Sequence, residues 1–266
     1  MRRMEYRELA ETGIMLPEVG LGTWRYRGGA APLVRGIELG ANLIDTAEIY
    51  GSEGVVGEAL QGRREGVFLA TKVSGEHLKP DQVRKAADQS LKRLGVSVID
   101  LYQVHWPNPR VPIEQTMQAL EELVDTGKVR YIGVSNFSRS QVEQAQAALK
   151  RNRIVSNQLE YHLLDRSIEA DFDFYSRERI LVIAYSPLAE GRLVSTRTRG
   201  YDVIEAVAQE AGKTPAQVVL NWCLVRPNVI TIPKSDREAR VEENCGASGW
   251  RLEPAHVARL EAAFPV

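Results

Sequence analysis

Eight short apolar runs alternate with amphipathic segments along almost the whole chain of 266 residues. The runs are rich in aliphatic and β-branched residues, as is typical of buried parallel strands. The expected strands are Val19–Thr23, Leu43–Asp45, Val67–Lys72, Val98–His105, Val129–Ser135, Ile154–Tyr161, Leu181–Ser186 and Val229–Pro233. The expected helices are Ala31–Leu39, Ser52–Leu60, Pro80–Leu94, Pro112–Asp125, Gln141–Ala148, Ile168–Arg179, Tyr201–Ala211, Ala216–Val225, Arg237–Asn244 and Pro254–Ala263. Such alternation predicts a parallel sheet built from βα units.

The number and length of the units favour a closed barrel. Eight units of about 33 residues each suit a (β/α)8 TIM barrel. A doubly wound open sheet is the alternative, but Gly20-Leu21-Gly22 starts its GxGxxG fingerprint without supplying the third glycine. Before the first unit, Met4–Leu9 and Ile14–Leu16 flank Glu11-Thr12-Gly13, which predicts a hairpin. We therefore predict one α/β domain over residues 1–266, a (β/α)8 TIM barrel with an N-terminal β-hairpin.

Composition excludes several classes of protein. The net charge is −1 with 26% charged residues, so no basic face is expected to bind nucleic acid. The longest apolar runs, such as Ile180–Tyr185, are too short to span a bilayer. The first residues, Met1–Tyr6, lack the apolar stretch of a signal peptide. Cys223 and Cys245 stand outside any CxxC pattern, which predicts reduced thiols and a cytoplasmic protein.

Polar side chains follow most of the expected strands. Asp45, Lys72 and His105 end three successive strands, and Tyr50 follows Asp45 by one short turn. Later strands end near a further set: Ser135, Asn136, Gln158, Tyr185, Ser186, Lys234 and Ser235. Because the carboxyl ends of barrel strands meet at one mouth, we expect these side chains to converge there.

The first four of these residues suit proton delivery to a carbonyl group. A free phenol such as Tyr50 has a pKa of ~10, too high for efficient donation at neutral pH. An ammonium at ~4 Å and an effective dielectric of ~20 contributes roughly 4 kcal/mol, or about 3 pKa units as an upper bound. Lys72 can supply that charge, and Asp45 can keep Lys72 protonated. His105 can donate a hydrogen bond to the carbonyl oxygen, acting as an orienter more than as an acid.

The same residues allow other interpretations. Asp45 alone can be a helix N-cap, and Tyr50 alone a structural tyrosine. Asp45, Glu48 and His105 could be imagined as metal ligands, but no HxH or HExxH spacing supports this, so no metal is expected. The serines near the strand ends do not stand in GxSxG, so serine hydrolysis is disfavoured.

On the basis of these residues, the chain resembles the aldo-keto reductase superfamily over nearly its whole length. Asp45, Tyr50, Lys72 and His105 match the catalytic tetrad of that family position for position. The matching segments are Gly20-Leu21-Gly22-Thr23-Trp24, Asp45-Thr46-Ala47-Glu48-Ile49-Tyr50, Thr71-Lys72, Val104-His105-Trp106-Pro107, Gly133-Val134-Ser135-Asn136-Phe137, Asn157-Gln158-Leu159-Glu160-Tyr161, Tyr185-Ser186-Pro187-Leu188 and Ile232-Pro233-Lys234-Ser235.

The resemblance implies a site for NADPH or NADP+. Ser135, Asn136 and Gln158 match residues that hydrogen-bond the nicotinamide carboxamide, and Tyr185 matches the aromatic ring stacked on the nicotinamide. Ser186 and Leu188 match the loop beside the pyrophosphate. Thr23 is also expected to bind the cofactor.

The adenosine end of the cofactor is implied to lie along residues 234–244. Lys234, Ser235 and Arg240 match ligands of the 2′-phosphate, and Glu243 and Asn244 match adenine contacts. Two cations and a hydroxyl suit a phosphomonoester, which favours NADPH over NADH. Asp236 in the same stretch would weaken this preference if it points inward.

The predicted function is NADPH-dependent reduction of aldehydes and ketones to alcohols, with Tyr50 as the proton donor. Trp24, Tyr50, His105 and Trp106 are the expected substrate contacts, and the two indoles favour apolar or aromatic small-molecule carbonyl compounds. The short stretch Pro107–Val111 and a chain end at Pro265-Val266 predict an open, loosely selective pocket, as in short bacterial members. An NADPH-binding regulatory subunit with little turnover is the alternative, and a monomer is one state that the sequence allows.

Overall fold

A computed structural model describes residues 3–265. Three residues lie outside the described part: Met1, Arg2 and Val266. The first two begin the segment Met1–Tyr6 that lacks a signal-peptide pattern, and Val266 is the last residue of the expected C-terminal end. The strands form an eight-stranded sheet and a separate two-stranded hairpin. Within residues 3–265, no helix combines the length and apolar character needed to cross a bilayer.

The eight-stranded sheet is parallel and follows chain order from β3 to β10. Its strands are β3 (Leu21–Gly22), β4 (Leu43–Asp45), β5 (Phe68–Val73), β6 (Ile99–Val104), β7 (Val129–Ser135), β8 (Ile154–Glu160), β9 (Leu181–Tyr185) and β10 (Val229–Thr231). Parallel bridges pair Val19 with Thr231 and Gly22 with Lys234, so the last strand returns to the first. The predicted barrel is confirmed, although the first and last strands are shorter than expected because isolated bridges replace a continuous ladder at the closing seam.

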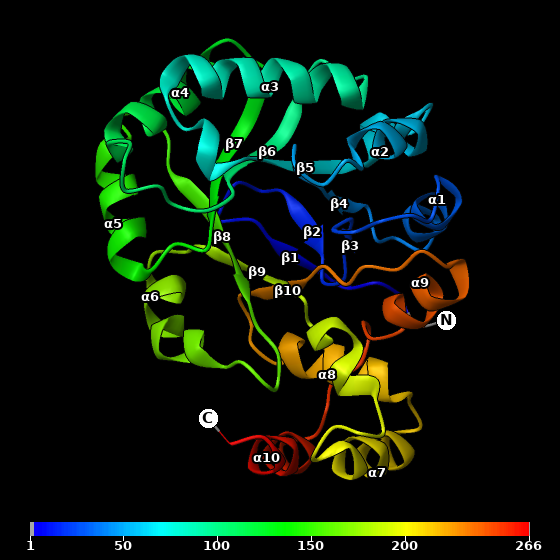
Figure 1. The fold of residues 1–266 in the computed structure, drawn as a ribbon. Coiled ribbons are helices and arrows are strands. Elements are labelled where there is room, and N and C mark those ends of the chain that lie inside the picture. Colours follow the sequence, from blue (N-terminus) through cyan, green and yellow to red (C-terminus); the bar gives the residue numbers. More distant parts are fainter. Residues whose placement is uncertain (1–2, 266) are drawn as a thin grey trace.

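Helices surround the barrel (Figure 1). They are α1 (Ala31–Glu38), α2 (Glu53–Leu60), α3 (Pro80–Leu94), α4 (Ile113–Asp125), α5 (Arg139–Ala148), α6 (Phe172–Arg177), α7 (Tyr201–Ala211), α8 (Pro215–Leu224), α9 (Glu238–Cys245) and α10 (Pro254–Ala263). The expected helix Ile168–Arg179 is wrong in its first third, which belongs to the 3-10 turn η3 (Ser167–Asp171). Glu169 accepts hydrogen bonds from Tyr161 and Arg166, and these side-chain contacts hold the chain in the tighter turn.

Apolar side chains fill two separate regions of the core. The larger lies between the outer surface of the strands and the surrounding helices. The smaller lies inside the barrel and includes Leu43, Leu101, Leu181 and Ile230 from four strands. Because the barrel strands pack against apolar side chains on both surfaces, they are mainly apolar, with polar residues such as Asp100, Gln103 and Arg130 as exceptions.

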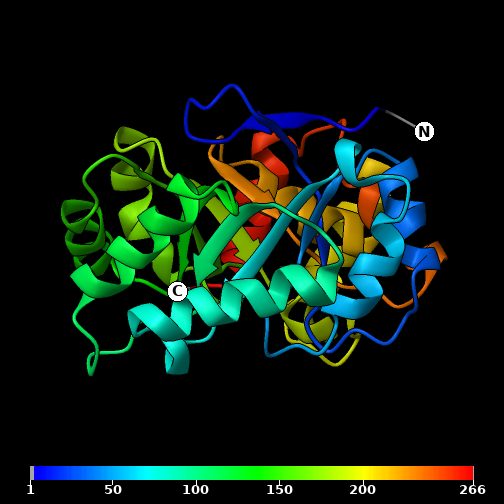
Figure 2. The same cartoon turned by 90° about the horizontal axis from the view of Figure 1, so that it is seen from above.

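The predicted hairpin closes the end of the barrel opposite the carboxyl ends of the strands (Figure 2). Strands β1 (Tyr6–Glu8) and β2 (Met15–Pro17) pair antiparallel, with Arg7 opposite Leu16. Leu9 and Leu16 are fully buried and belong to the apolar cluster inside the barrel. The hairpin is thus a plug, which leaves the carboxyl ends of the strands as the open mouth.

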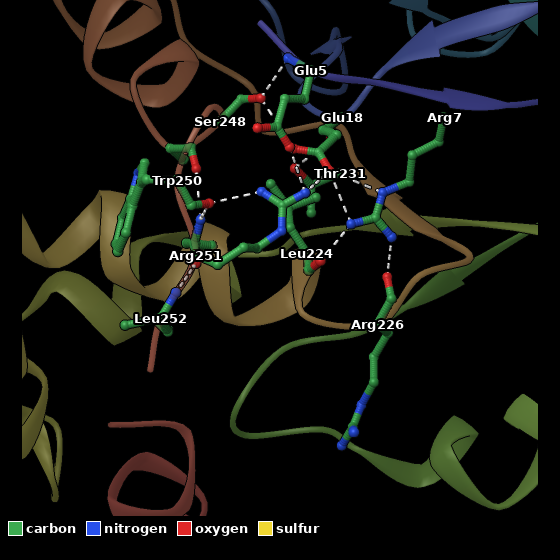
Figure 3. Close-up of polar contacts among 12 residues, drawn as sticks. Glu5, Arg7, Glu18, Leu224, Arg226, Thr231, Ser248, Trp250, Arg251 and Leu252 are labelled. Carbon is green, nitrogen blue, oxygen red and sulfur yellow. Dashed lines mark hydrogen bonds and ion pairs between the residues drawn. The ribbon is translucent and has the colours of Figure 1, made fainter. Parts of the chain in front are cut away.

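A buried carboxylate fastens the hairpin to the closing seam (Figure 3). Glu18 is 1% exposed, and its Oε1 accepts hydrogen bonds from Nε and Nη2 of Arg7 at 3.0 and 2.9 Å. Arg251 also pairs with Oε1, and Ser248 donates to Oε2 at 3.0 Å. The backbone carbonyl of Glu18 accepts from the N–H of Thr231 at 2.8 Å. One residue therefore joins the hairpin, the seam and the segment after α9.

Candidate active site

The polar side chains at the strand ends converge on one cavity of about 650 Å³ at the barrel mouth. Its size is in the range of small-molecule sites. Many of the predicted site residues line this cavity. They are Thr23, Trp24, Asp45, Tyr50, His105, Trp106, Ser135, Asn136, Gln158, Tyr185, Ser186, Leu188 and Lys234. Lys72 lies beneath the cavity floor and is fully buried.

Asp45, Lys72, Tyr50 and His105 form one hydrogen-bonded group. The ammonium of Lys72 donates to Oδ1 of Asp45 at 2.6 Å and to the hydroxyl oxygen of Tyr50 at 3.4 Å. The Tyr50 hydroxyl is 3.2 Å from Nε2 of His105. The phenol thus stands at the cavity surface between a buried cation and an imidazole.

Burial sets the protonation of this group as much as charge does. Desolvation raises the pKa of Tyr50 by more than Lys72 lowers it, so the net direction is upward, opposite to that expected from Lys72 alone. Burial by itself would lower the pKa of Lys72, but Asp45 and Tyr50 outweigh it and raise that pKa. Burial, together with the Lys72 charge, lowers the pKa of His105 to about 3. The site therefore holds a neutral phenol, an ammonium and a neutral imidazole at pH 7.

Two glutamines hold the second oxygen of Asp45. Nε2 of Gln158 donates to Oδ2 at 2.7 Å, and Nε2 of Gln103 approaches the same atom at 3.4 Å. Both side chains are buried. From the sequence, Gln158 was expected only at the cofactor and Gln103 was not expected in the site, although a polar residue inside the apolar run Ile99–Val104 was an available signal.

Hydrogen bonds donated by side chains fix the cavity wall that is implied to face the nicotinamide. Nδ2 of Asn136 donates to the carbonyl of His105 at 2.9 Å, and the Tyr185 hydroxyl donates to Oδ1 of Asn136 at 3.0 Å. Ser135 donates to the carbonyl of Gln158 at 2.8 Å. The ring of Tyr185 is therefore held at the cavity surface, where a flat heterocycle can stack on it. This geometry fits a nicotinamide ring.

Strained backbone is concentrated around the cavity. Eight non-glycine residues in the described part of the chain have positive φ, and four of them line the cavity: Arg25, Asn136, Ser186 and Glu190. This backbone conformation costs free energy in a non-glycine residue, so it persists only where the surrounding structure holds it. Such positions are common at binding sites.

The implied adenosine end is only partly connected to the cavity. Lys234 lines it, whereas Ser235, Arg240, Glu243 and Asn244 lie outside it, on the stretch leading into α9 and on α9 itself. Lys234 pairs with the carboxylate of Asp236, whose other oxygen accepts from the N–H of Arg27 at 2.8 Å. Arg240 pairs with Glu243. The cations expected to bind a 2′-phosphate are therefore each paired with a carboxylate that a phosphate would have to displace or share.

The outer rim combines apolar side chains with an ion pair. Trp24 is 40% exposed and Ile49 is 53% exposed, and both line the cavity together with Trp106. Arg25 lies over the ring of Trp24 and pairs with Glu190 at 3.4 Å. The sequence gives no signal for this pair, because its members are 165 positions apart and neither stands in a motif.

Comparison with known proteins identifies the family. The model of the aldo/keto reductase family matches residues 18–264. This chain belongs to the aldo/keto reductase family. Methylglyoxal reductase YeaE of Escherichia coli is 37% identical to this aldo/keto reductase, over 95% of this chain and 92% of that protein. Aldo-keto reductase YhdN of Bacillus subtilis is 32% identical, over 94% of this chain and 90% of its own length.

Solved structures share the fold closely. An aldo-keto reductase from Klebsiella pneumoniae in complex with NADPH superimposes on this aldo/keto reductase with a TM-score of 0.91 and 32% identity, covering 98% of this chain and 95% of that one. A thermostable aldo-keto reductase in complex with the inhibitor epalrestat gives a TM-score of 0.90 and 36% identity, covering 98% and 100%. Among residues 3–265 of this reductase, no group of three or more His, Cys, Asp and Glu side chains is arranged to hold a metal ion.

Proposed function

We propose that this protein is a single-domain NADPH-dependent reductase of small aldehydes and ketones, with Tyr50 as the proton donor. The observation that carries the proposal is the position of the Tyr50 hydroxyl, 3.2 Å from His105 and 3.4 Å from Lys72 at the surface of the cavity. The similarity to a methylglyoxal reductase and to a reductase crystallised with NADPH supports it.

The four residues divide the work on the substrate oxygen. NADPH, held by Asn136, Gln158 and Tyr185, would supply the hydride for the carbonyl carbon. Tyr50 transfers its hydroxyl proton to the carbonyl oxygen, which leaves an alcohol and a phenolate. Lys72 stabilises that phenolate, and Asp45 holds the ammonium in place. His105, neutral at pH 7, donates one hydrogen bond that orients the carbonyl oxygen.

The first test is NADPH oxidation with a panel of aldehydes, including methylglyoxal. We expect Tyr50→Phe to lower kcat/KM by about 10²–10⁴-fold, because only the proton donor is removed, and to leave NADPH affinity unchanged. Tyr201→Phe, on the surface helix α7, is the matched control. Equal turnover by wild type and Tyr50→Phe would refute the assignment. Tight NADPH binding with negligible turnover of every carbonyl would instead favour the regulatory subunit.

Preference for NADPH over NADH is proposed to depend on Lys234, which lines the cavity. Removing one cation from a phosphate site costs about tenfold in affinity. We therefore expect Lys234→Ala to raise the Kd of NADPH about tenfold and to leave that of NADH nearly unchanged, as measured by fluorescence titration. Lys150→Ala, a distant exposed cation, is the control. A parallel loss for both cofactors would contradict this role.

A further inference from the structure

One wall of the substrate cavity lies against a residue without a side chain. Trp106 lines the cavity, whereas Gly75, which touches its indole, is buried and does not line it. A Cβ atom on Gly75 would stand 2.1 Å from Nε1 and 2.3 Å from Cδ1 of Trp106. The indole therefore lies between Gly75 and the space available to a substrate.

The backbone conformation of Gly75 does not itself require glycine. Gly75 begins the 3-10 turn η2 (Gly75–His77), and its φ is not in the positive range. An alanine could adopt the same backbone conformation. The nearest atoms that an added Cβ would meet all belong to the neighbouring indole.

The loop that carries Gly75 is tied down on both sides. Nδ2 of Asn108 donates to the carbonyl of Gly75 at 2.7 Å. Oε1 of Glu48 accepts from the backbone N–H of Ser74 and lies 3.0 Å from Nδ1 of His77. The side chain of Glu48 is only 6% exposed, so its contact with the Ser74 N–H is partly shielded from water, whereas His77 itself is exposed. An added methyl group would therefore displace the indole more readily than the loop.

We propose that Gly75 is a specificity-determining residue, because the room it leaves for Trp106 sets the width of the cavity beside Tyr50. The inference rests on the proposed carbonyl reduction. Restoring an ordinary contact moves the indole edge from 2.1 Å to 3.4 Å, a shift of about 1.3 Å toward the cavity. The ring of His105 lies 4.7 Å away, between centroids, and limits movement on that side. A shift of this size is enough to exclude a bulky substrate.

The test compares a bulky and a small substrate in Gly75→Ala. We expect kcat/KM for naphthaldehyde to fall at least about tenfold relative to that for methylglyoxal, mainly through KM, with the Kd of NADPH unchanged. Gly54→Ala is the matched control, since a Cβ there meets nothing within 4 Å. A folded Gly75→Ala enzyme with the wild-type ratio of the two substrates would overturn the proposal.

A second variant separates the indole from the loop. Trp106→Phe removes the pyrrole edge that faces Gly75, so adding Gly75→Ala to it should change the substrate ratio less than about twofold. If Gly75→Ala alone does not fold, the double variant should still fold and have the substrate ratio of Trp106→Phe. A double variant that does not fold would show that the loop itself needs glycine, which contradicts the proposal.

A readout independent of turnover separates this inference from the proposed function. The indole N–H resonance of Trp106, assigned by its loss in Trp106→Phe, should shift in Gly75→Ala and stay in place in Gly54→Ala. Wild-type enzyme that reduces neither aldehyde contradicts the proposed function, whereas an unshifted resonance contradicts the placement of the indole by Gly75.

Discussion

His105 shows how a single residue acquires its chemistry from its surroundings. Its imidazole is 8% exposed, touches Tyr50 through Nε2 and has no partner at Nδ1. Burial and the Lys72 charge lower its pKa to about 3, well below the ordinary value of 6.5. The ring is therefore neutral across the physiological range, which suits a hydrogen-bond donor and does not suit a general acid.

This lowered pKa predicts an acid-dependent loss of stability. Between about pH 6.5 and about pH 3 the unfolded chain binds a proton at His105 that the folded chain does not. The free energy of unfolding therefore falls with falling pH, by at most about 1.4 kcal/mol per unit from this residue. Urea unfolding at pH 7, 5.5 and 4.5 should show a shallower dependence in His105→Gln than in wild type. An unchanged slope in His105→Gln would count against the lowered pKa.

Short elements at the base of the barrel depend on side chains for their attachment. The hairpin strands β1 and β2 have three residues each, too few for stability without packing. Glu18 supplies the link, since Arg7 and Arg251 meet at its carboxylate. Arg7 also donates to the carbonyls of Leu224 and Arg226. The hairpin is therefore held by a buried ionic network as well as by apolar contact.

Removing the charge at the centre of this network should destabilise the protein. Glu18→Gln leaves two guanidinium groups without their common partner, and the loss of one member of a buried pair costs about 3–5 kcal/mol. We expect Tm to fall by about 2–4 °C for each kcal/mol in a chain of this size. Glu143→Gln breaks an exposed pair with Arg139 and should cost less than about 1 kcal/mol. Similar Tm values for the two variants would show that the network is energetically neutral.

Across the whole molecule, closure of the barrel places every strand end at one mouth. At the seam between β3 and β10, two backbones approach each other closely. A Cβ atom on Gly22 would stand 2.4 Å from the carbonyl oxygen of Ile232, which belongs to the backbone and cannot rotate away. Thr23 and Trp24 on one side of the seam, and Lys234 on the other, reach the cavity from there.

An alanine at this seam should therefore affect both folding and the site. We expect Gly22→Ala to cost about 3 kcal/mol, because the two backbones must separate, and to weaken NADPH binding through Lys234. Differential scanning calorimetry and fluorescence titration measure the two effects. Gly54→Ala, in the open on α2, should be neutral or stabilising by up to about 1 kcal/mol. Wild-type Tm in Gly22→Ala would show that the seam can relax at no cost.

Local patterns in the sequence were sufficient for the barrel, the hairpin and the polar strand ends that converge at the mouth. Period and capping are local properties: Thr214 caps α8 through Gln217, and Ser138 caps α5 through Gln141, within three residues of each other. The helix predicted over Ile168–Arg179 is partly wrong for the opposite reason. Glu169 accepts hydrogen bonds from Tyr161 and Arg226, and both of these residues lie outside the segment whose pattern predicted the helix.

The sequence by itself determined which residues end the strands, and hence that Asp45, Tyr50 and His105 would meet above Lys72. Only the tertiary structure decided how they are tuned. The upward pKa shift of Tyr50 depends on desolvation, which no local pattern encodes. The approach of Gln103 to Asp45, the Arg25–Glu190 pair and the contact of Gly75 with Trp106 join segments distant in the chain. Strand order brings such segments together, but distances and burial become defined only when the barrel has closed and packed.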